Sequence, residues 1–219
     1  MEKEWFREWF DENYLHIYCH RDTNDAKKQV DLILKKISPG KNDKILDLGC
    51  GEGRHVCLLS GKVYNVTGLD LSETLLRKGR EKHCRINLIR GDMREIPGKF
   101  NIILSLFTSF GYFTRDSENI DVVNGIYNSL EQNGHFWLDF LNSEYVKEHI
   151  VNKNIFKLGD GSEVTEVRNI YDNRVIKDIT IDRDGVQKKY RESVRLFSLK
   201  ELEVILNTSG FKIKNIYGN

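Results

Sequence analysis

The segment that most constrains the fold is ILDLGCGEGRH, residues 45–55. A short apolar run leads there into three glycines at alternate positions, Gly49, Gly51 and Gly53. Glycine loses more conformational freedom on folding than any other residue, so this turn must need unusual torsion angles or the close approach of a ligand. In open parallel sheets, the turn between the first strand and the first helix is where nucleotide-like ligands bind.

Strand-like and helix-like segments alternate through the middle of the chain. Short apolar strands are expected at 44–49, 65–71, 86–92, 101–107 and 134–141, and helices at 54–60, 72–83 and 117–131. Continuous apolar strands that alternate with helices are typical of a parallel sheet covered on both faces. The expected fold class is α/β, with a doubly wound, mostly parallel Rossmann-like sheet.

The two flanks have a different texture. Aromatic residues at helical spacing predict one helix over 4–18, and a second apolar stripe predicts another over 23–37. Polar-alternating strands with DN and DRDG turns predict an antiparallel β-meander without a core of its own. A capping box formed by Ser198 and Glu201 opens a last helix, and FKIKNIYGN is expected to form a sixth strand of the core sheet.

These segments predict four regions. They are an N-terminal helical cap at 1–39, a Rossmann-like core at 40–155, an antiparallel insertion at 156–197, and the last helix and strand of the core at 198–219. An insertion after the fifth strand emerges near the strand ends that bind ligand, so we expect it to form a lid or a dimer surface.

Composition narrows the partners. Lys plus Arg (34) and Asp plus Glu (33) nearly cancel, which argues against a nucleic-acid partner. The four cysteines form no CxxC pair, so we expect reduced thiols and no metal site. The N-terminus lacks the order of a signal peptide, and no apolar run approaches the roughly 20 residues of a membrane span. We expect a cytoplasmic protein with a small-molecule partner and no membrane partner, and a homodimer is open.

Acidic residues follow two of the predicted strands. Asp70 ends the second strand, where a carboxylate can accept both hydroxyls of a ribose. Asp92 ends the third strand, where it can accept a hydrogen bond from an adenine amino group beside the soft side chain of Met93. The spacing D-x-G-x-G-x-G that starts at Asp47 differs from the dinucleotide fingerprint, and Glu52 inside the loop opposes a pyrophosphate.

Four ordered motifs carry a family resemblance: ILDLGCGEGRH, GLDLS, GDMREIP and NIILSLFTSFGYF. Over about residues 40–141 the chain resembles the class I S-adenosylmethionine-dependent methyltransferases. The flanks are similar to small-molecule methyltransferases of bacteria and archaea, among them sugar N-methyltransferases. The resemblance implies S-adenosylmethionine as cofactor and methyl transfer to a small-molecule acceptor by in-line displacement.

The resemblance also implies which residues bind the cofactor. Gly49 and Gly51 would admit its methionine part, and Leu106 would lie on the sulfonium side. Arg21 is a candidate partner for the methionine carboxylate, with a surface salt bridge as the alternative. The cofactor residues predicted in full are Asp47, Gly49, Cys50, Gly51, Asp70, Leu71, Asp92, Met93, Leu106, Tyr14 and Arg21.

The acceptor is expected beyond the fourth strand. Ser109, Phe110 and Tyr112 are predicted to line its pocket together with Tyr18. No dedicated general base stands out, so the catalytic residue is open, and an amine or an already acidic acceptor is favoured over other N, O or C acceptors. His55 is expected to face its own helix or solvent and not a metal.

Three other functions are left open by the residues alone. They are a non-catalytic cofactor-binding or regulatory protein, a methyltransferase that acts on RNA or protein, and an NAD-dependent dehydrogenase. The glycine spacing and the lack of a suitably placed Tyr-x-x-x-Lys pair count against the dehydrogenase. Methyltransferases of this fold usually end with a sixth and a seventh strand, and FKIKNIYGN supplies only one, so we expect an incomplete sheet edge.

Overall fold

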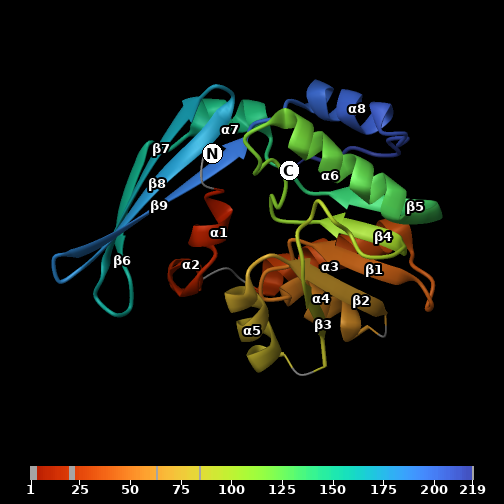
Figure 1. The fold of residues 1–219 in the computed structure, drawn as a ribbon, viewed down its shortest axis with the longest axis horizontal. Helices are drawn as coiled ribbons and strands as arrows, with labels where there is room; N and C mark the ends of the chain where they lie inside the picture. Colours follow the sequence, from red (N-terminus) through yellow and green to blue (C-terminus); the bar gives the residue numbers. More distant parts are fainter. Residues whose placement is uncertain (1–3, 20–22, 63, 84, 219) are drawn as a thin grey trace. The chain divides into compact units, whose positions relative to one another are not determined.

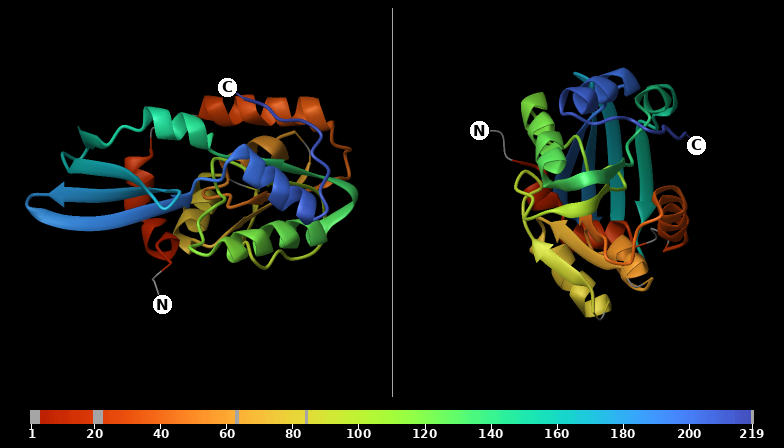
Figure 2. Two further views of the ribbon diagram at one scale, coloured as in Figure 1. Left: turned by 90° about the horizontal axis from the view of Figure 1, so that it is seen from above. Right: turned by 90° about the vertical axis from the view of Figure 1, so that its right-hand side faces the viewer.

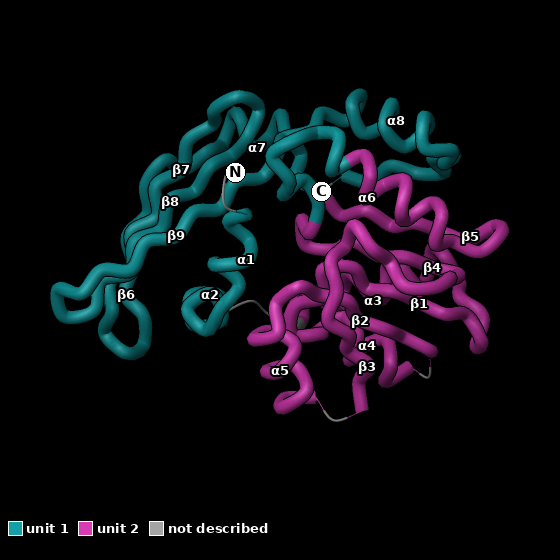
Figure 3. The backbone as a smooth tube through the Cα atoms, viewed as in Figure 1, with its two compact units in different colours: residues 1–19, 110–119, 141–219 teal, residues 20–109, 120–140 magenta. Residues whose placement is uncertain are grey.

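The computed structural model describes residues 4–19, 23–62, 64–83 and 85–218. The chain divides into two compact units, which Figure 3 draws in different colours. Unit 1 comprises residues 1–19, 110–119 and 141–219, and unit 2 comprises residues 20–109 and 120–140.

Unit 2 is built on a parallel sheet of five strands in the order β3-β2-β1-β4-β5 (Figure 1). In chain order the strands are β1 (Lys44–Leu48), β2 (Asn65–Asp70), β3 (Asn87–Arg90), β4 (Phe100–Ser105) and β5 (Leu130–Leu138). β1 is central, with Ile45 opposite Val66 of β2 on one side and Ile102 of β4 on the other. The strand order reverses between β1 and β4, so the carboxyl ends of these two strands form the switch point where such sheets bind ligands.

Helices cover both faces of this sheet. They are α3 (Thr23–Ile37), α4 (Arg54–Ser60), α5 (Glu73–Lys82) and α6 (Asp116–Ser129). α3 and α6 lie on opposite sides of the strands (Figure 2), as right-handed crossovers in two directions require. One buried cluster joins α3, α4 and α5 to the sheet and includes Val30, Ile33, Ile45, Val56, Leu59, Val66, Leu76, Ile102 and Leu104. The predicted doubly wound fold is confirmed.

Unit 1 contains an antiparallel sheet in the order β6-β7-β8-β9. Its strands are β6 (Lys153–Lys157), β7 (Glu163–Tyr171), β8 (Arg174–Arg183) and β9 (Val186–Arg195). Asp172 and Asn173 both have positive φ, as the tight turns that join twisted antiparallel strands require. The predicted meander is confirmed, and β6 adds a strand that the sequence pattern did not reveal.

The N-terminal helices α1 (Phe6–Trp9) and α2 (Glu12–Ile17) cover the antiparallel sheet and form a shared core with it. Trp9 is fully buried and packs in one cluster with Val164 and Ile179 of the sheet. Its indole N–H donates to a carboxylate oxygen of Glu192 at 2.6 Å. The meander thus has no core of its own, because its apolar partners come from the other end of the chain.

Two further expectations are corrected. Residues 4–18 form two helices instead of one, because the Asp11 carboxylate accepts hydrogen bonds from the backbone N–H groups of Asn13 and Tyr14 and caps α2. Residues 211–218 form no strand. Their apolar alternation fails at Asn215, and Ile216 is 55% exposed. The core sheet is incomplete as expected, although it lacks the sixth strand as well as the seventh within the part of the chain that is described.

Unit 1 also contains α7 (Ser143–His149) and α8 (Leu199–Thr208). The capping box predicted for α8 is present: Ser198 Oγ accepts from the Glu201 N–H, and the Glu201 carboxylate accepts from the Ser198 N–H at 2.8 Å. The sequence pattern did not reveal α7, which is short and capped by Asn142.

The packing of Trp9 generates a stability prediction. Trp9→Ala should lower the free energy of unfolding by about 3–5 kcal/mol, because it empties a fully buried site between α1 and the antiparallel sheet. Trp9→Phe keeps most of the buried ring and loses the bond to Glu192, so it should cost roughly 1–3 kcal/mol. Urea unfolding followed by circular dichroism measures both. A loss below about 1 kcal/mol for Trp9→Ala would show that α1 is not part of this core.

Candidate functional site

The glycine loop lies between β1 and α4, and all three of its alternate glycines have positive φ: Gly49 (75°), Gly51 (57°) and Gly53 (72°). The carbonyl oxygen of Leu69, near the end of β2, accepts the N–H groups of Gly49 at 2.8 Å and Cys50 at 3.1 Å. A Cβ on Gly51 would meet only the Leu75 side chain, at 3.8 Å. The loop thus presents bare backbone at the switch point of the sheet.

Asp70 holds this loop from the neighbouring strand. One of its carboxylate oxygens accepts the Gly51 N–H and the other accepts the Ser72 N–H, each at 2.8 Å. Burial raises the pKa of Asp70, and these backbone hydrogen bonds act in the opposite direction. Each oxygen has further lone-pair capacity, so the carboxylate can still accept hydroxyl donors of a ligand.

Asp47 lies behind the loop with only 1% of its surface exposed. Its Oδ2 atom is buried and has no hydrogen-bond donor among the described residues. Burial and, to a smaller extent, the nearby Asp70 charge raise the pKa of Asp47 to about 7, although the Arg54 charge acts in the opposite direction. A buried carboxylate without a donor favours a positively charged ligand group nearby.

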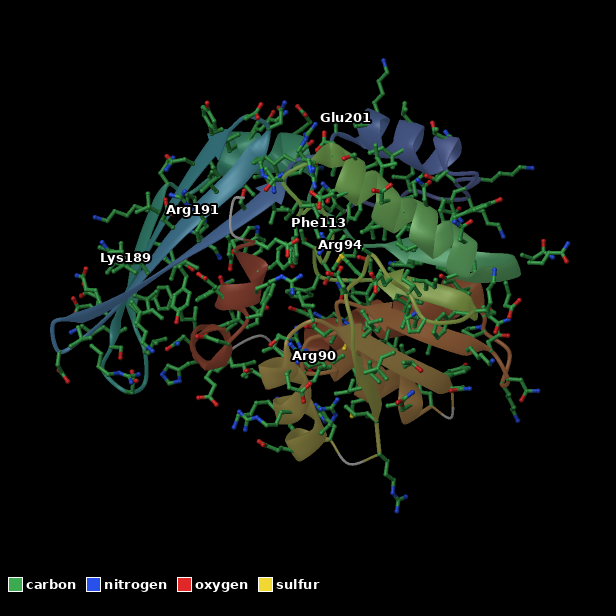
Figure 4. All side chains as sticks on the ribbon, viewed as in Figure 1. Arg90, Arg94, Phe113, Lys189, Arg191 and Glu201 are labelled. Carbon is green, nitrogen blue, oxygen red and sulfur yellow. The ribbon has the colours of Figure 1, made fainter. Side chains whose placement is uncertain are left out.

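Asp92 follows β3 and is bound by its own neighbour. The Arg94 guanidinium donates to both carboxylate oxygens, at 3.0 Å and 2.6 Å. Arg94 is labelled in Figure 4. Met93 comes close to the glycine loop, since its terminal methyl group lies 3.8 Å from the point that a Cβ added to Gly49 would occupy. The carboxyl ends of β1, β2 and β3 thus bring together Asp47, Asp70, Met93 and the glycines.

Comparison with known proteins identifies this arrangement. Residues 45–134 match the model of the methyltransferase domain family. An S-adenosylmethionine-dependent methyltransferase from Clostridium acetobutylicum ATCC 824 has a similar structure, with a TM-score of 0.74 and 25% identity over 90% of this chain and 86% of that one. The chain is a class I S-adenosylmethionine-dependent methyltransferase.

Two relatives and one further structure extend the comparison. A protein of Geobacillus sp. (strain WCH70) that is named as a methyltransferase is 27% identical over 79% of this methyltransferase and 75% of its own length. A dTDP-3-amino-3,4,6-trideoxy-alpha-D-glucopyranose N,N-dimethyltransferase of Streptomyces venezuelae is 33% identical over 41% of this chain and 39% of its own. The sugar N-methyltransferase KedS8 from Streptoalloteichus sp. ATCC 53650 shares the fold, with a TM-score of 0.70 and 16% identity over 91% and 83%.

The residues at the switch point fit the cofactor of this methyltransferase. S-adenosylmethionine carries positive charge and a ribose. The Asp47 oxygen that receives no donor from the described residues fits the positive charge, the Asp70 carboxylate fits the ribose, and the open backbone of Gly51 leaves room for the cofactor. Two further findings, on metal ions and on membrane-spanning helices, apply to the described residues. Those residues contain no His, Cys, Asp or Glu cluster suited to a metal ion. They also contain no helix long and apolar enough to span a membrane.

Several predicted residues of unit 2 have structural contacts. Leu106 is 3% exposed and belongs to the core cluster, as does Cys50, whose thiol pKa is raised by burial. Ser109 donates its hydroxyl to the carbonyl oxygens of Leu106, at 2.8 Å, and Gly49, at 3.2 Å. Leu71 is partly buried directly after Asp70. Ser109 thus ties the end of β4 to the glycine loop.

The remaining predicted residues belong to unit 1 or lie outside the described residues. Tyr14 and Tyr18 join the aromatic cluster around Trp9, and Tyr112 packs against Trp5 with 4.9 Å between ring centroids. Phe110 is buried and stacks on Phe197. Arg21 lies outside the described residues.

Three site residues were not predicted as ligand-binding: His55, Gln29 and Asp139. His55 is 5% exposed, and its Nε2 lies 3.0 Å from the Gln29 side-chain oxygen, so it faces α3 rather than its own helix or solvent. The Gln29 amide donates to Asp139 at 2.9 Å. Two signals were present, because Asp139 follows a strand as Asp70 and Asp92 do, and Gln29 stands on the inward stripe of α3.

The open backbone of Gly51 allows a matched pair of substitutions. Gly51→Ala and Gly98→Ala both place a Cβ at positive φ, without a clash inside the protein. Each should cost roughly 1–2 kcal/mol of stability. Only Gly51→Ala should weaken S-adenosylhomocysteine binding, by about tenfold or more, because its Cβ stands where a ligand would approach. Calorimetric titration measures this, and equal affinities for the two variants would remove Gly51 from the site.

The burial of Asp47 generates a pH prediction. Its pKa is about 7 in the folded protein against an ordinary value of 3.8, so its ionisation lowers stability as the pH rises between those values. Asp47→Asn should therefore be more stable than the wild type by roughly 2 kcal/mol at about pH 8, and the difference should shrink toward about pH 5. Urea unfolding at several pH values measures it. The same variant should bind S-adenosylhomocysteine more weakly, and a constant stability difference across this range would contradict the assignment.

Proposed function

We propose that this methyltransferase methylates a nitrogen atom of a small-molecule amine, with nucleotide-linked amino sugars as the first class to test. The observation that carries the proposal is the likeness of almost the whole chain, antiparallel sheet included, to the sugar N-methyltransferase fold. The Streptomyces relative, which is named for an amino sugar, supports it from sequence.

The chemistry at the carboxyl ends of β4 and β5 supports an amine acceptor. Residues 105–109 and 138–140 contain one titratable side chain, that of Asp139. One of its oxygens already accepts two N–H donors, from Gln29 and from the Phe107 backbone. A hydroxyl acceptor would need a base to remove its proton, whereas a neutral amine brings its own lone pair.

In this proposal the protein binds the cofactor and the acceptor, orients them toward one another, and excludes water from the site. When bound, S-adenosylmethionine supplies an electrophilic methyl group on a cationic sulfur. Asp70 would hold the ribose hydroxyls, Asp47 would face a positive charge of the cofactor, and the Met93 side chain would contact the adenine ring. Holding two reactants in line can supply several kcal/mol of the rate enhancement without a dedicated base.

The acceptor pocket is proposed from the sequence. Tyr18, Ser109, Phe110 and Tyr112 would line it, and Tyr14 and Arg21 would contribute to the cofactor site. The antiparallel insertion is proposed as a lid or a dimer surface.

A methyl-transfer assay tests the proposal. The purified protein is incubated with tritiated S-adenosylmethionine and a dTDP-linked amino sugar, the matching dTDP-linked sugar with a hydroxyl group in place of the amine, or transfer RNA. We expect label only in the amino sugar, at a rate that rises about tenfold per pH unit below the pKa of the amine because only the neutral form reacts. Label in the hydroxyl sugar or in the RNA would overturn it.

A further inference from the structure

A chain of partly buried polar contacts in unit 2 links Asp47, which lies directly before the glycine loop, to the end of β5. It runs from Asp47 on β1 to His55 on α4, then to Gln29 on α3 and to Asp139 after β5. Asp139 also accepts the backbone N–H of Phe107 at 3.0 Å. Phe107 (φ 56°) and Thr108 (φ 60°) are consecutive non-glycine residues in the left-handed region, so this loop needs such external bonds to keep its shape.

The direction of every donor in this chain follows from its Asp139 end. An ionised carboxylate only accepts hydrogen bonds, so the Gln29 amide must point its NH₂ group toward Asp139. The Gln29 oxygen therefore faces His55 Nε2, at 3.0 Å, and that ring nitrogen must carry a proton. Burial and the Arg54 charge lower the pKa of His55 to about 4, so near neutral pH the ring carries a single proton.

The other ring nitrogen then has a consequence for Asp47. His55 Nδ1 carries no proton and lies 4.0 Å from Asp47 Oδ2. When Asp47 is ionised, two hydrogen-bond acceptors thus face one another in a buried place, and Oδ2 receives no donor from the described residues. A proton on Nδ1 would instead have made His55 the internal donor to Asp47.

We propose that Gln29 and Asp139 are positioning residues of the cofactor site, which lock His55 as the Nε2–H tautomer and so leave the ionised Asp47 without a donor from His55. The Asp47 carboxylate then depends on a positive charge of the cofactor for its partner. The same Asp139 oxygen accepts the Phe107 N–H, so one carboxylate sets both the position of the proton on His55 and the backbone at the end of β4.

Nuclear magnetic resonance of the ligand-free protein tests the tautomer directly. Nitrogen-15 labelling of the histidine rings distinguishes a protonated from an unprotonated ring nitrogen for each tautomer. We expect the wild-type His55 ring to be neutral with its proton on Nε2. A wild-type signal from the Nδ1–H tautomer, or from a mixture of both, would overturn the proposal without any variant.

Two variants of similar side-chain size distinguish an effect on the His55 tautomer from an effect on packing. Gln29→Met removes the acceptor of the Nε2 proton, so the proton should move to Nδ1, where it can donate to Asp47. Asp139→Leu removes the acceptor that orients the Gln29 amide, so both His55 tautomers should be populated. Asp31→Asn, on the exposed side of α3, is the surface control.

Calorimetric titration with S-adenosylhomocysteine gives the second measurement. Gln29→Met should bind about tenfold more weakly because His55 would then donate to Asp47. Asp139→Leu should also bind more weakly, whereas Asp31→Asn should stay within about twofold of the wild type. Wild-type affinity in Gln29→Met, or an unchanged His55 tautomer in Asp139→Leu, would overturn the proposal. Neither measurement uses a methyl acceptor, so the outcome is independent of the amine proposed above.

Discussion

The attachment of the glycine loop to the end of β2 is the constraint on which the site depends. The Leu69 carbonyl and the Asp70 carboxylate bind the N–H groups of Gly49, Cys50 and Gly51. The contact requires close approach, because a Cβ on Gly68 would lie 2.7 Å from the Cys50 sulfur. With the loop fixed in this way, α4 begins at Arg54 after its N-cap Gly53, bare backbone is presented at the switch point, and Asp47 is enclosed behind it.

The buried groups behind this loop are matched to a cation and not to one another. Asp47 is buried and Asp70 is partly buried, and the Asp70 charge disfavours the ionised form of Asp47. His55 is held neutral and contributes no positive charge. An internal ion pair would have stabilised the ligand-free protein more, but it would also have met the need that a cationic cofactor meets on binding. The site is therefore expected to lose stability in exchange for affinity.

Unit 1 uses its charges in the opposite way. Glu166 is 3% exposed on the antiparallel sheet and pairs with Arg168, while Lys177 lies 2.7 Å from a Glu192 oxygen. Glu192 also accepts hydrogen bonds from Trp9 and from the Tyr18 hydroxyl group. Complete pairing lets polar residues lie under the N-terminal helices, and this pairing explains how strands with a polar pattern can cover a buried core.

The sequence by itself determined the elements whose causes are local. Apolar runs specified the strands of the parallel sheet, Ser72 and Ser198 specified helix starts, and the glycines with Asp70 specified the cofactor loop. Tertiary structure alone decided what depends on residues distant in the chain. The N-terminal helices supplied the core of the antiparallel sheet, and Gln29, His55 and Asp139 met only after α3, α4 and β5 had packed together. The physical reason is that a hydrogen bond between distant residues leaves no period or spacing in the sequence, whereas a helix cap or a buried strand does.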